Sequence, residues 1–555
     1  MTSLAAALQE ALPRLGQCAA EPAVLELIAA LASGLERGEL ELSLEGAPPE
    51  EISPEGWPSR HRQALRASPL VALAEASARN PEAPLVLDGL QLRWRRWHVL
   101  LQTVLANLQE RAQQPLMAAA TDDQLQHALA HAARQGLDER QQQAVRALLC
   151  HGLVLLGGGP GTGKTSTVVQ MLAAALRLQP ELRLHLAAPT GKAATRLGQA
   201  VAAGASRLDA GLDAAIAERL QQAPCSTLHR LLESSGERFL RHQRHPLALD
   251  LLVVDEVSMV DLPLMQALLH ALPPHCRLLL VGDPAQLPPV GPGAVLLELC
   301  KPQSLQALGE AAVELTTTYR NNGAIAAVAQ ALRPTPTQER LQLDSASLLT
   351  QLEALGPNDN LRWHTHSTSR LPQSVLVRLR QHHQNLTDLA QALHWAATDA
   401  LPQNSEPLLA ELERCILLSP MRQGPWGVDS VHRQLLAEHY GQPIQAWPLG
   451  TPVLNQRNLP EQGLANGDIG VLVERNGERL VLFPGGRLLH PARLSQATPA
   501  LALTIHKSQG SQYAEVLLLM PPTRHWDPRL LYTGLTRARS QALLVTPDKA
   551  GVSAA

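Results

Sequence analysis

Lysine, paired cysteines and long apolar runs are scarce or missing in this chain of 555 residues. The six cysteines lie far apart and form no CxxC pair, which argues against a disulfide framework or a zinc site and favours free thiols in a reducing cytoplasm. No apolar run approaches the ~20 residues that a membrane helix needs. The first residues carry Glu10 and Arg14 in an amphipathic pattern unlike a signal peptide. We therefore expect a cytoplasmic protein of about three or four domains with no membrane partner.

The charge balance excludes a uniformly basic nucleic-acid binder, because the net charge is −3. A local basic groove stays open, since exposed charges are screened from one another at long range. The basic residues are almost all arginines, and the chain has only five lysines. Three of these, Lys164, Lys192 and Lys507, fall inside the motifs described below. This suggests that a compact ammonium group does something there that a guanidinium cannot.

The most informative feature is a glycine-rich loop. Residues 157–165 read Gly-Gly-Gly-Pro-Gly-Thr-Gly-Lys-Thr directly after the apolar run 153–156. This spacing is that of the phosphate-binding loop (P-loop), in which backbone N–H groups and the next helix N-terminus surround the phosphates of a nucleotide. We predict that Lys164 neutralises the β- and γ-phosphates and that Thr165 ligates Mg²⁺. The residues expected to hold the nucleotide are Gly158, Gly159, Pro160, Gly161, Thr162, Gly163, Lys164, Thr165 and Ser166.

Polar residues that suit nucleotide hydrolysis follow two further apolar segments. Asp255 and Glu256 come directly after the run 251–254, where the first would hold Mg²⁺ through water and the second would orient or deprotonate the attacking water. Gln286 follows the run 277–281 and is placed to touch the γ-phosphate. Gln141, which precedes the P-loop, is a weaker candidate for reading the adenine edge. Arg320 and Arg537 are candidates for a γ-phosphate contact across a domain boundary.

The chain divides into three predicted regions. Residues 1–115 are mostly helical in pattern, with a short strand and turn at 84–89. They contain a Trp- and Arg-rich stretch at 93–97, which we interpret as a packed face or protein contact rather than a stacking surface for nucleic acid. From 116 to 330, apolar strands at 153–156, 183–188, 250–254 and 277–281 alternate with helices, which predicts a parallel α/β sheet. A second α/β region covers 331–555, and residues 445–495 within it are typical of a β-rich insertion.

The ordered motifs along residues 137–545 resemble those of the superfamily-one helicases, and within them the RecD family, the alpha subunits of exodeoxyribonuclease V. Besides the P-loop, the resemblance rests on Ala188-Pro-Thr-Gly-Lys-Ala-Ala194, Thr227-Leu-His-Arg230, Asp255-Glu-Val-Ser-Met259, Gly282-Asp-Pro-Ala-Gln-Leu-Pro288, Tyr319-Arg320, Thr504-Ile-His-Lys-Ser-Gln-Gly510 and Tyr532-Thr-Gly-Leu-Thr-Arg-Ala-Arg539. It implies an α/β fold with two RecA-like P-loop domains, which bind ATP in the cleft between them and single-stranded DNA across their tops. It also implies a helical N-terminal partner-binding domain and a small SH3-like insertion in the second RecA-like domain.

The resemblance also implies roles for individual residues. Gln141, Gly163, Lys164, Thr165, Asp255, Glu256, Gln286, Arg320 and Arg537 would serve ATP, with Mg²⁺ at Thr165 and Asp255. The DNA path would follow Pro189, Thr190, Lys192, His229, Thr504, His506 and Lys507, whose polar groups suit sequence-independent contacts to phosphate and sugar. A hairpin at about 234–247 would separate the strands with an exposed Phe239, although an ordinary basic loop remains an alternative. Gln512 stands where we expect glutamate in relatives, which puts a ribose or arginine contact there in question.

The function that the resemblance implies is an ATP-dependent 5′→3′ single-stranded DNA translocase and DNA helicase. It would be the motor subunit of a helicase/nuclease complex that acts at duplex ends in recombinational double-strand-break repair, with two larger RecB-like and RecC-like subunits. The sequence shows no separate cluster of spaced carboxylates and lysine, so we expect another subunit to cut DNA. Two alternatives remain: a free-standing 5′→3′ helicase of the same family, and an ATP-switched regulatory DNA-binding subunit without productive unwinding.

Overall fold

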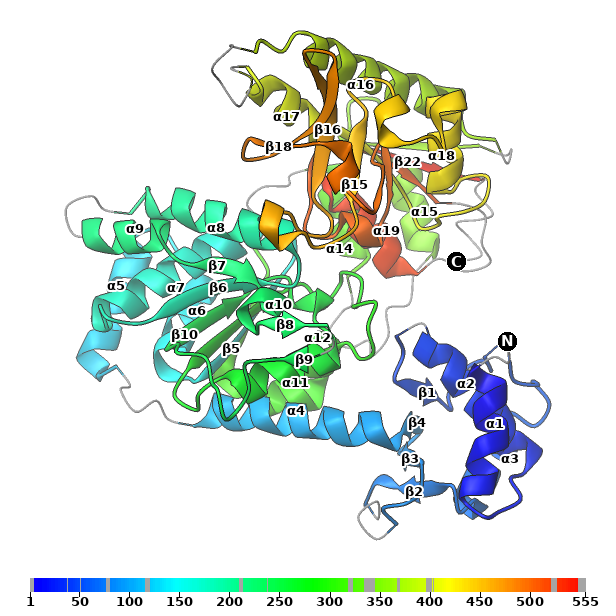
Figure 1. Cartoon of the computed structure of the whole chain (residues 1–555). Helices are drawn as coiled ribbons and strands as arrows, with labels where there is room; N and C mark the ends of the chain where they lie inside the picture. The colour runs from blue at the N-terminus through cyan, green and yellow to red at the C-terminus, as the bar shows by residue number, and fades with distance from the viewer. Residues whose placement is uncertain are drawn as a thin grey trace.

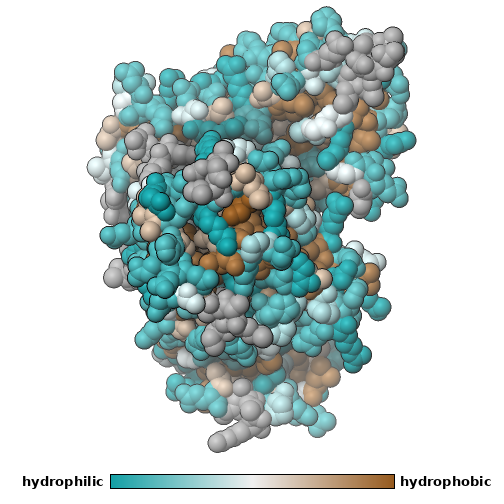
Figure 2. Space-filling view, turned by 90° about the vertical axis from the view of Figure 1, so that its left-hand side faces the viewer, coloured by the Kyte–Doolittle hydropathy of each residue, from teal (hydrophilic) through white to brown (hydrophobic). Residues whose placement is uncertain are grey.

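The computed structural model describes residues 4–547 except 37, 50, 76–79, 115–119, 209–212, 237, 318–322, 334–344, 367–369, 396–401, 403 and 521–526. Figure 1 shows three bodies: a small N-terminal region, a first α/β domain reached through one long helix, and a second α/β domain stacked on the first. The face in Figure 2 is mainly hydrophilic, with smaller hydrophobic areas between the polar residues. Within the described residues, no helix is long and apolar enough to cross a membrane.

The N-terminal region contains a sheet as well as helices. The sheet has the order β1-β4-β3-β2, so the prediction of a helical domain is incomplete. Its elements are α1 (Leu4–Leu15), α2 (Pro22–Glu36), β1 (Glu41–Ser43), α3 (Ser59–Ala67), β2 (Val71–Leu73), β3 (Leu85–Asp88) and β4 (Gln91–Trp94). Within the stretch 93–97, Trp94 is buried and Arg93 bonds to Glu41 and Asp88. The aromatic stretch is therefore a packed face, as the sequence indicated.

A long helix joins this region to the first α/β domain. α4 (Arg95–Gln113) packs against α11 (Leu262–Ala271) and α13 (Pro302–Leu308), and in Figure 1 it runs beneath that domain. Leu101, Val104 and Leu108 of α4 enter the domain core. Arg111, also buried, donates to the carbonyls of Leu272, Pro273 and Cys276. Because buried carbonyls need donors, Arg111 stabilises this junction.

The first α/β domain is built on a parallel six-stranded sheet in the order β12-β5-β11-β10-β6-β7. The four strands predicted from apolar runs are present as β5 (Leu153–Gly158), β6 (Leu184–Ala188), β10 (Leu251–Val254) and β11 (Arg277–Gly282). The edge strands are β7 (Cys225–Thr227) and β12 (Ala312–Leu315). The remaining elements are α5 (Asp122–Arg134), α6 (Glu139–Cys150), α7 (Lys164–Leu178), α8 (Gly191–Ala205), α9 (Ala214–Gln221), α10 (Leu228–Leu231), β8 (Ser234–Ser235), β9 (Arg238–Phe239) and α12 (Val295–Leu299).

The second α/β domain holds a parallel sheet in the order β13-β22-β21-β14-β20. Its strands are β13 (Leu361–Thr365), β14 (Cys415–Ser419), β20 (Ala502–Thr504), β21 (Tyr513–Leu519) and β22 (Ala538–Thr546). Its helices are α14 (Ala324–Ala331), α15 (Ser345–Glu353), α16 (Gln373–Gln391), α17 (Glu406–Leu412), α18 (Val428–Leu436) and α19 (Pro528–Leu535). α14 packs on α15 and α19, so the residues just before 331 lie with this domain.

An antiparallel five-stranded sheet interrupts the second domain between α18 and β20. Its order is β18-β17-β16-β15-β19, with β15 (Pro452–Asn455), β16 (Ile469–Arg475), β17 (Glu478–Phe483), β18 (Arg487–Leu489) and β19 (Ala497–Pro499). Val453, Leu472, Val481 and Phe483 form part of its own buried core. Another face, with Val471 and Leu482, shares a core with α16 and α17. The β-rich segment predicted at 445–495 is therefore a sheet anchored on the second domain.

Candidate nucleotide site and nucleic-acid interface

The P-loop follows β5 and ends where α7 begins. Gly161 and Gly163 have φ values of 78° and 81°, a left-handed backbone that favours glycine. Lys164 is the first residue of α7, and its Nζ donates to the carbonyl oxygens of Gly158 at 2.6 Å and Gly159 at 2.9 Å. The ammonium group is therefore held inside the loop, at the N-terminus of a helix, where a phosphate would be attracted.

Asp255 and Glu256 lie at the carboxyl end of β10, one strand away from β5 across β11. Glu256 has a left-handed backbone (φ 52°), and its amide donates to Asp255 Oδ1 at 2.9 Å. A non-glycine residue in this conformation carries strain, which is concentrated at functional sites. Burial raises the pKa of Asp255 and the charge of Glu256 adds to that effect, whereas Lys164 and Arg196 oppose it. The two carboxylates and the P-loop lysine thus form one electrostatic unit.

The donor set at this edge fits a magnesium ion shared with a nucleotide. Thr165 offers a hydroxyl oxygen and Asp255 a carboxylate oxygen, and Mg²⁺ prefers one or two such protein ligands together with phosphate oxygens and water. No group of three or more His, Cys, Asp and Glu side chains that could hold a metal ion occurs within the described part of the chain.

Gln286 and Asp283 follow β11 and are buried beside the second domain. The Oε1 atom of Gln286 is buried without a hydrogen-bond partner among the described residues, so an acceptor is left without a donor close to the P-loop strand. Asp283 is fully buried, and its Oδ2 accepts the hydroxyl of Tyr532 at 2.6 Å. Burial and the charge of Asp283 raise the pKa of Tyr532 well above its ordinary value. The phenol therefore stays protonated and donates.

Further hydrogen bonds close the seam between the two α/β domains. The amide of Leu287 donates to Thr533 Oγ1 at 3.0 Å, and its carbonyl accepts Gln509 Nε2 at 3.1 Å. Arg196, on α8, donates to the carbonyl of Gly510 at 2.9 Å and to Gln512 Oε1 at 3.1 Å. Because position 512 holds glutamine instead of the expected glutamate, an arginine contact there was in question. Arg196 makes that contact, and the neutral side-chain amide of Gln512 is the acceptor. The loop after β11 touches both the nucleotide site and the second domain.

We expect Tyr532→Phe to weaken this seam, because it removes the hydroxyl donor from Oδ2 of the buried Asp283 carboxylate. Losing the partner of a buried charged acceptor costs about 1–3 kcal/mol, which should appear as a lower melting temperature. Tyr440→Phe is the matched control, since Tyr440 is half-buried and its ring, which faces Arg433 at 5.4 Å, is kept. Equal melting temperatures for the two variants would show that the bond contributes nothing.

The remaining residues predicted for ATP have different placements. Arg320 lies outside the described residues. Arg537 is buried within its own domain, where it donates to the carbonyls of Thr533 at 3.1 Å and Ser511 at 3.3 Å. Gln141 closes a capping box at the start of α6, with its Oε1 accepting the Asp138 amide. The oxygen that would accept from the adenine amino group is thus already bonded, and the roles of these three residues stay predictions.

Six of the seven residues predicted along DNA lie where β6 and β20 end, and the seventh, His229, lies in α10 after β7. Thr190 caps α8, Lys192 Nζ lies 5.4 Å from the ring centroid of Tyr513, and Thr504 Oγ1 accepts the Lys507 amide. A Cβ built on Gly510 would lie 3.4 Å from Thr190 Oγ1, so the two predicted segments adjoin across the domain boundary. Pro189 is half-buried, and His506 and Lys507 are exposed. These side chains therefore line one side of the same seam.

Two family models match the chain: one described as an AAA domain, over residues 141–292, and one described as a UvrD-like helicase C-terminal domain, over residues 499–545. The RecBCD enzyme subunit RecD of Mycolicibacterium smegmatis is 38% identical over 427 residues, covering 73% of this chain and 70% of that protein. The chain belongs to the RecD family. The ATP-dependent RecD2 DNA helicase of Deinococcus radiodurans is 31% identical over 494 residues, covering 85% of this chain and 56% of that protein. Among solved structures, Bacteroides Pif1 bound to ssDNA aligns with 17% identity and a TM-score of 0.39, over 74% of this chain and 92% of that one.

In this member of the RecD family, the two parallel α/β sheets belong to P-loop domains of the RecA-like type, as the resemblance implied. The hairpin predicted at 234–247 contains a two-stranded sheet, β8 with β9. Phe239 is half-buried: it packs against the core of the first domain and lies 6.0 Å from the ring of the exposed His229. The expectation of an exposed Phe239 is therefore wrong. The neighbouring Leu240, with 55% of its surface exposed, is the large apolar side chain that projects there.

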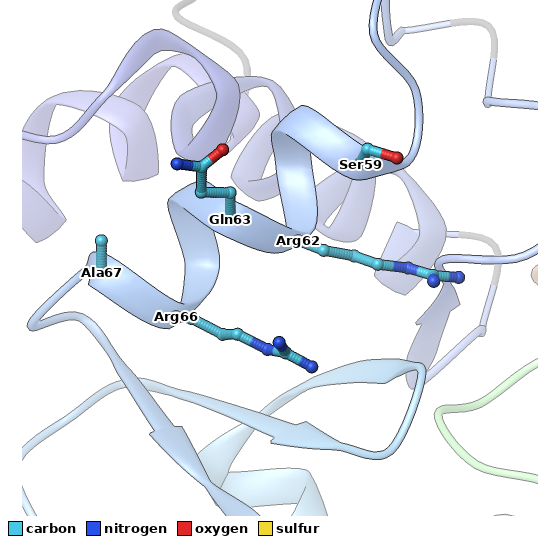
Figure 3. A pocket seen from close by; sticks show the side chains of 5 residues that line it. All are labelled: Ser59, Arg62, Gln63, Arg66 and Ala67. Atoms are coloured by element: carbon cyan, nitrogen blue, oxygen red, sulfur yellow. The ribbon is translucent and has the colours of Figure 1, made fainter.

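A separate open pocket lies on α3 of the N-terminal region (Figure 3). It is lined by Ser59, Arg62, Gln63, Arg66 and Ala67, and the two arginines extend to the same side of the helix. Arg62 donates to the carbonyl of Leu44 at 2.7 Å, so part of its charge is used to hold the local fold. None of the predicted nucleotide or DNA residues lines this pocket.

Sequence patterns did not single out four residues that lie in the seam beside the candidate nucleotide site. These are Arg196, Asp283, Arg333 and Tyr532. Asp283 and Tyr532 lie inside quoted motifs, which is a signal that could have marked them. Arg196 lies two residues after one such motif. Arg333 lies in no motif, and only its position in three dimensions connects it to the P-loop.

Proposed function

We propose that this chain is an ATP-dependent 5′→3′ single-stranded DNA translocase and DNA helicase. It acts as the motor subunit of a RecBCD-type helicase/nuclease complex in recombinational double-strand-break repair. One observation carries the proposal: a P-loop site with paired carboxylates is tied to the second domain by the loop after β11. A change at the phosphates is therefore transmitted to the surface where the predicted DNA residues lie.

The nucleotide chemistry follows from the positions of the charged groups. Lys164 holds the β- and γ-phosphates, and Glu256 orients or deprotonates the attacking water. Thr165, and Asp255 through water, would hold Mg²⁺ beside the phosphates, and the bound ion would neutralise charge at the transferring phosphoryl group. Gln286 contacts the γ-phosphate. This contact changes with the nucleotide state, because ADP lacks that phosphate. Arg320 and Arg537 remain candidates for contacting the γ-phosphate when the cleft between the two domains closes.

Movement along DNA follows from opening and closing of the seam. Closure tightens contacts between the loop after β11 and the segment 504–512, and hydrolysis relaxes them. Pro189, Thr190, Lys192 and His229 of the first domain and Thr504, His506 and Lys507 of the second would hold the strand alternately. Contacts to phosphate and sugar are independent of sequence, which suits a motor that must pass every base.

The finer architecture belongs to the same proposal. Residues 1–115 form a partner-binding domain, residues 116–317 belong to the first RecA-like domain, and the second begins with α14 at Ala324. The β-rich insertion is SH3-like. The complex contains two larger RecB-like and RecC-like subunits, works in the cytoplasm at duplex ends, and carries its nuclease centre on another chain.

The test is ATP-dependent unwinding of two matched partial duplexes, one with a 5′ tail and one with a 3′ tail. We expect the chain, alone or reconstituted with its partners, to open the 5′-tailed substrate and to leave the 3′-tailed one closed. Opening of the 3′-tailed substrate alone would overturn the polarity. If the reconstituted complex separates neither strand pair while ATP is hydrolysed, the chain is a regulatory switch instead. Copurification decides the remaining alternative, because a chain that copurifies with no large partner subunits would be a free-standing helicase.

A further inference from the structure

Arg333 is the arginine that the described structure places directly against the P-loop. It follows α14, and its amide bonds to the carbonyl of Gln330 at 3.1 Å, which continues the end of the helix. The preceding residue, Leu332, is buried in the core of the second domain. The backbone of Arg333 is therefore fixed by that domain, while its side chain reaches the first.

The guanidinium lies over Gly159. A Cβ built on Gly159 would collide with Nη1 of Arg333 and would lie 3.4 Å from the hydroxyl of Tyr532. The carbonyl of Gly159 itself accepts Lys164 Nζ at 2.9 Å, so Arg333 sits at the rim of the same loop. Its side chain is 13% exposed, which makes it a largely desolvated cation.

Two carboxylates compensate this charge in the present arrangement. Nη2 of Arg333 lies 3.0 Å from Glu314 Oε1 and 3.9 Å from Asp283 Oδ1. Burial lowers the pKa of Arg333, but Asp283, Tyr532 and Glu314 outweigh burial and raise it overall. Glu314 is 59% exposed and Asp283 already accepts Tyr532. Neither Glu314 nor Asp283 therefore accepts two parallel hydrogen bonds from Arg333. N–H donors of the guanidinium remain available for a ligand with several oxygens.

Resting on the function proposed above, we infer that Arg333 is a phosphate-contacting catalytic residue that the second domain supplies across the cleft. When ATP occupies the loop, its terminal phosphate presents oxygens at the rim beside Gly159. The guanidinium of Arg333 then leaves Glu314 and bonds to these phosphate oxygens. An arginine brought there by domain closure stabilises charge that develops in the transition state and ties hydrolysis to the closed form.

The test compares Arg333→Ala with Arg333→Lys in DNA-stimulated ATP hydrolysis and in binding of fluorescent ADP and a fluorescent non-hydrolysable ATP analogue. We expect Arg333→Ala to lower kcat by about 10²–10³-fold. It should also weaken binding of the ATP analogue while leaving ADP binding unchanged, because ADP lacks the phosphate that Arg333 contacts. Arg333→Lys should recover part of kcat, since it keeps the charge but loses the planar fork.

The control is Arg14→Ala, which removes an arginine that is 75% exposed and whose ion pair among the described residues is with Glu10. Equal losses of ADP and ATP-analogue affinity in Arg333→Ala would show a merely structural tie and overturn the inference. Turnover equal to that of the unsubstituted chain would do the same. Absence of ATP hydrolysis in the unsubstituted chain would instead contradict the proposed function, so the two failures are distinguishable.

Discussion

Replacing Lys164 by glutamine should abolish ATP hydrolysis while the protein stays folded. Glutamine can keep a hydrogen bond to the carbonyls of Gly158 or Gly159, which now accept Nζ at 2.6 and 2.9 Å, but it removes the positive charge from the loop. Losing one preorganised charge-stabilising group of this kind costs about 10²–10³-fold in kcat. The loss of phosphate attraction in ATP binding comes in addition. Phosphate release and binding of a fluorescent ATP analogue measure the two effects.

Lys301→Gln is the matched control for this variant. Lys301 is 44% exposed and pairs with Glu298 at 2.8 Å, so its replacement removes a lysine charge from the same domain but outside the loop. The melting temperatures of both variants should stay close to that of the unsubstituted chain. Retained turnover by Lys164→Gln would refute the site assignment. Lost turnover with undiminished strand separation and an altered cutting pattern in the assembled complex would favour a regulatory switch.

The parallel sheet of the first domain could be predicted wherever a strand is buried on both faces. β10 and β11 consist of uninterrupted buried residues, and such strands read as continuous apolar runs. The edge strands β7 and β12 were not predicted, because β7 is half-buried throughout and β12 alternates between buried and exposed positions. In the N-terminal region, the short strand predicted at 84–89 is present as β3. The other strands of its sheet were missed for a related reason: they have three or four residues, too few to establish a period.

The local part of the site was predictable, and the contacts across the cleft were not. A P-loop is a contiguous stretch whose backbone conformation is set by its own glycines, so its sequence suffices to identify it. The bond from Tyr532 to Asp283 joins residues 249 positions apart, and the one from Arg196 to Gln512 joins residues 316 apart. No periodic pattern in the sequence indicates that residues so far apart are in contact. Arg537 illustrates the limit, since a motif marked it for the phosphates, whereas its guanidinium bonds to carbonyls of its own domain.

The arrangement of Glu256 yields the second large prediction. Glu256→Gln should lower kcat for ATP by about 10²–10⁴-fold, the usual contribution of a positioned general base, while binding of ATP and single-stranded DNA is retained. Glutamine has nearly the same size and should adopt the left-handed backbone at this position (φ 52°) about as readily as glutamate. The substitution also removes a negative charge that helps to raise the pKa of Asp255, so the remaining carboxylate stays ionised more readily.

Glu256→Gln and Lys164→Gln therefore separate binding from chemistry. The first should give a protein that holds ATP and DNA together without turnover, and the second a protein that does not hold ATP. Glu310→Gln, at an exposed acid of the same domain, controls for the loss of one carboxylate. Turnover by Glu256→Gln equal to that of this control would remove Glu256 from the chemistry. Loss of ATP binding in Glu256→Gln would mean that its charge serves to shape the loop rather than to activate water, because a base acts only on the bound complex.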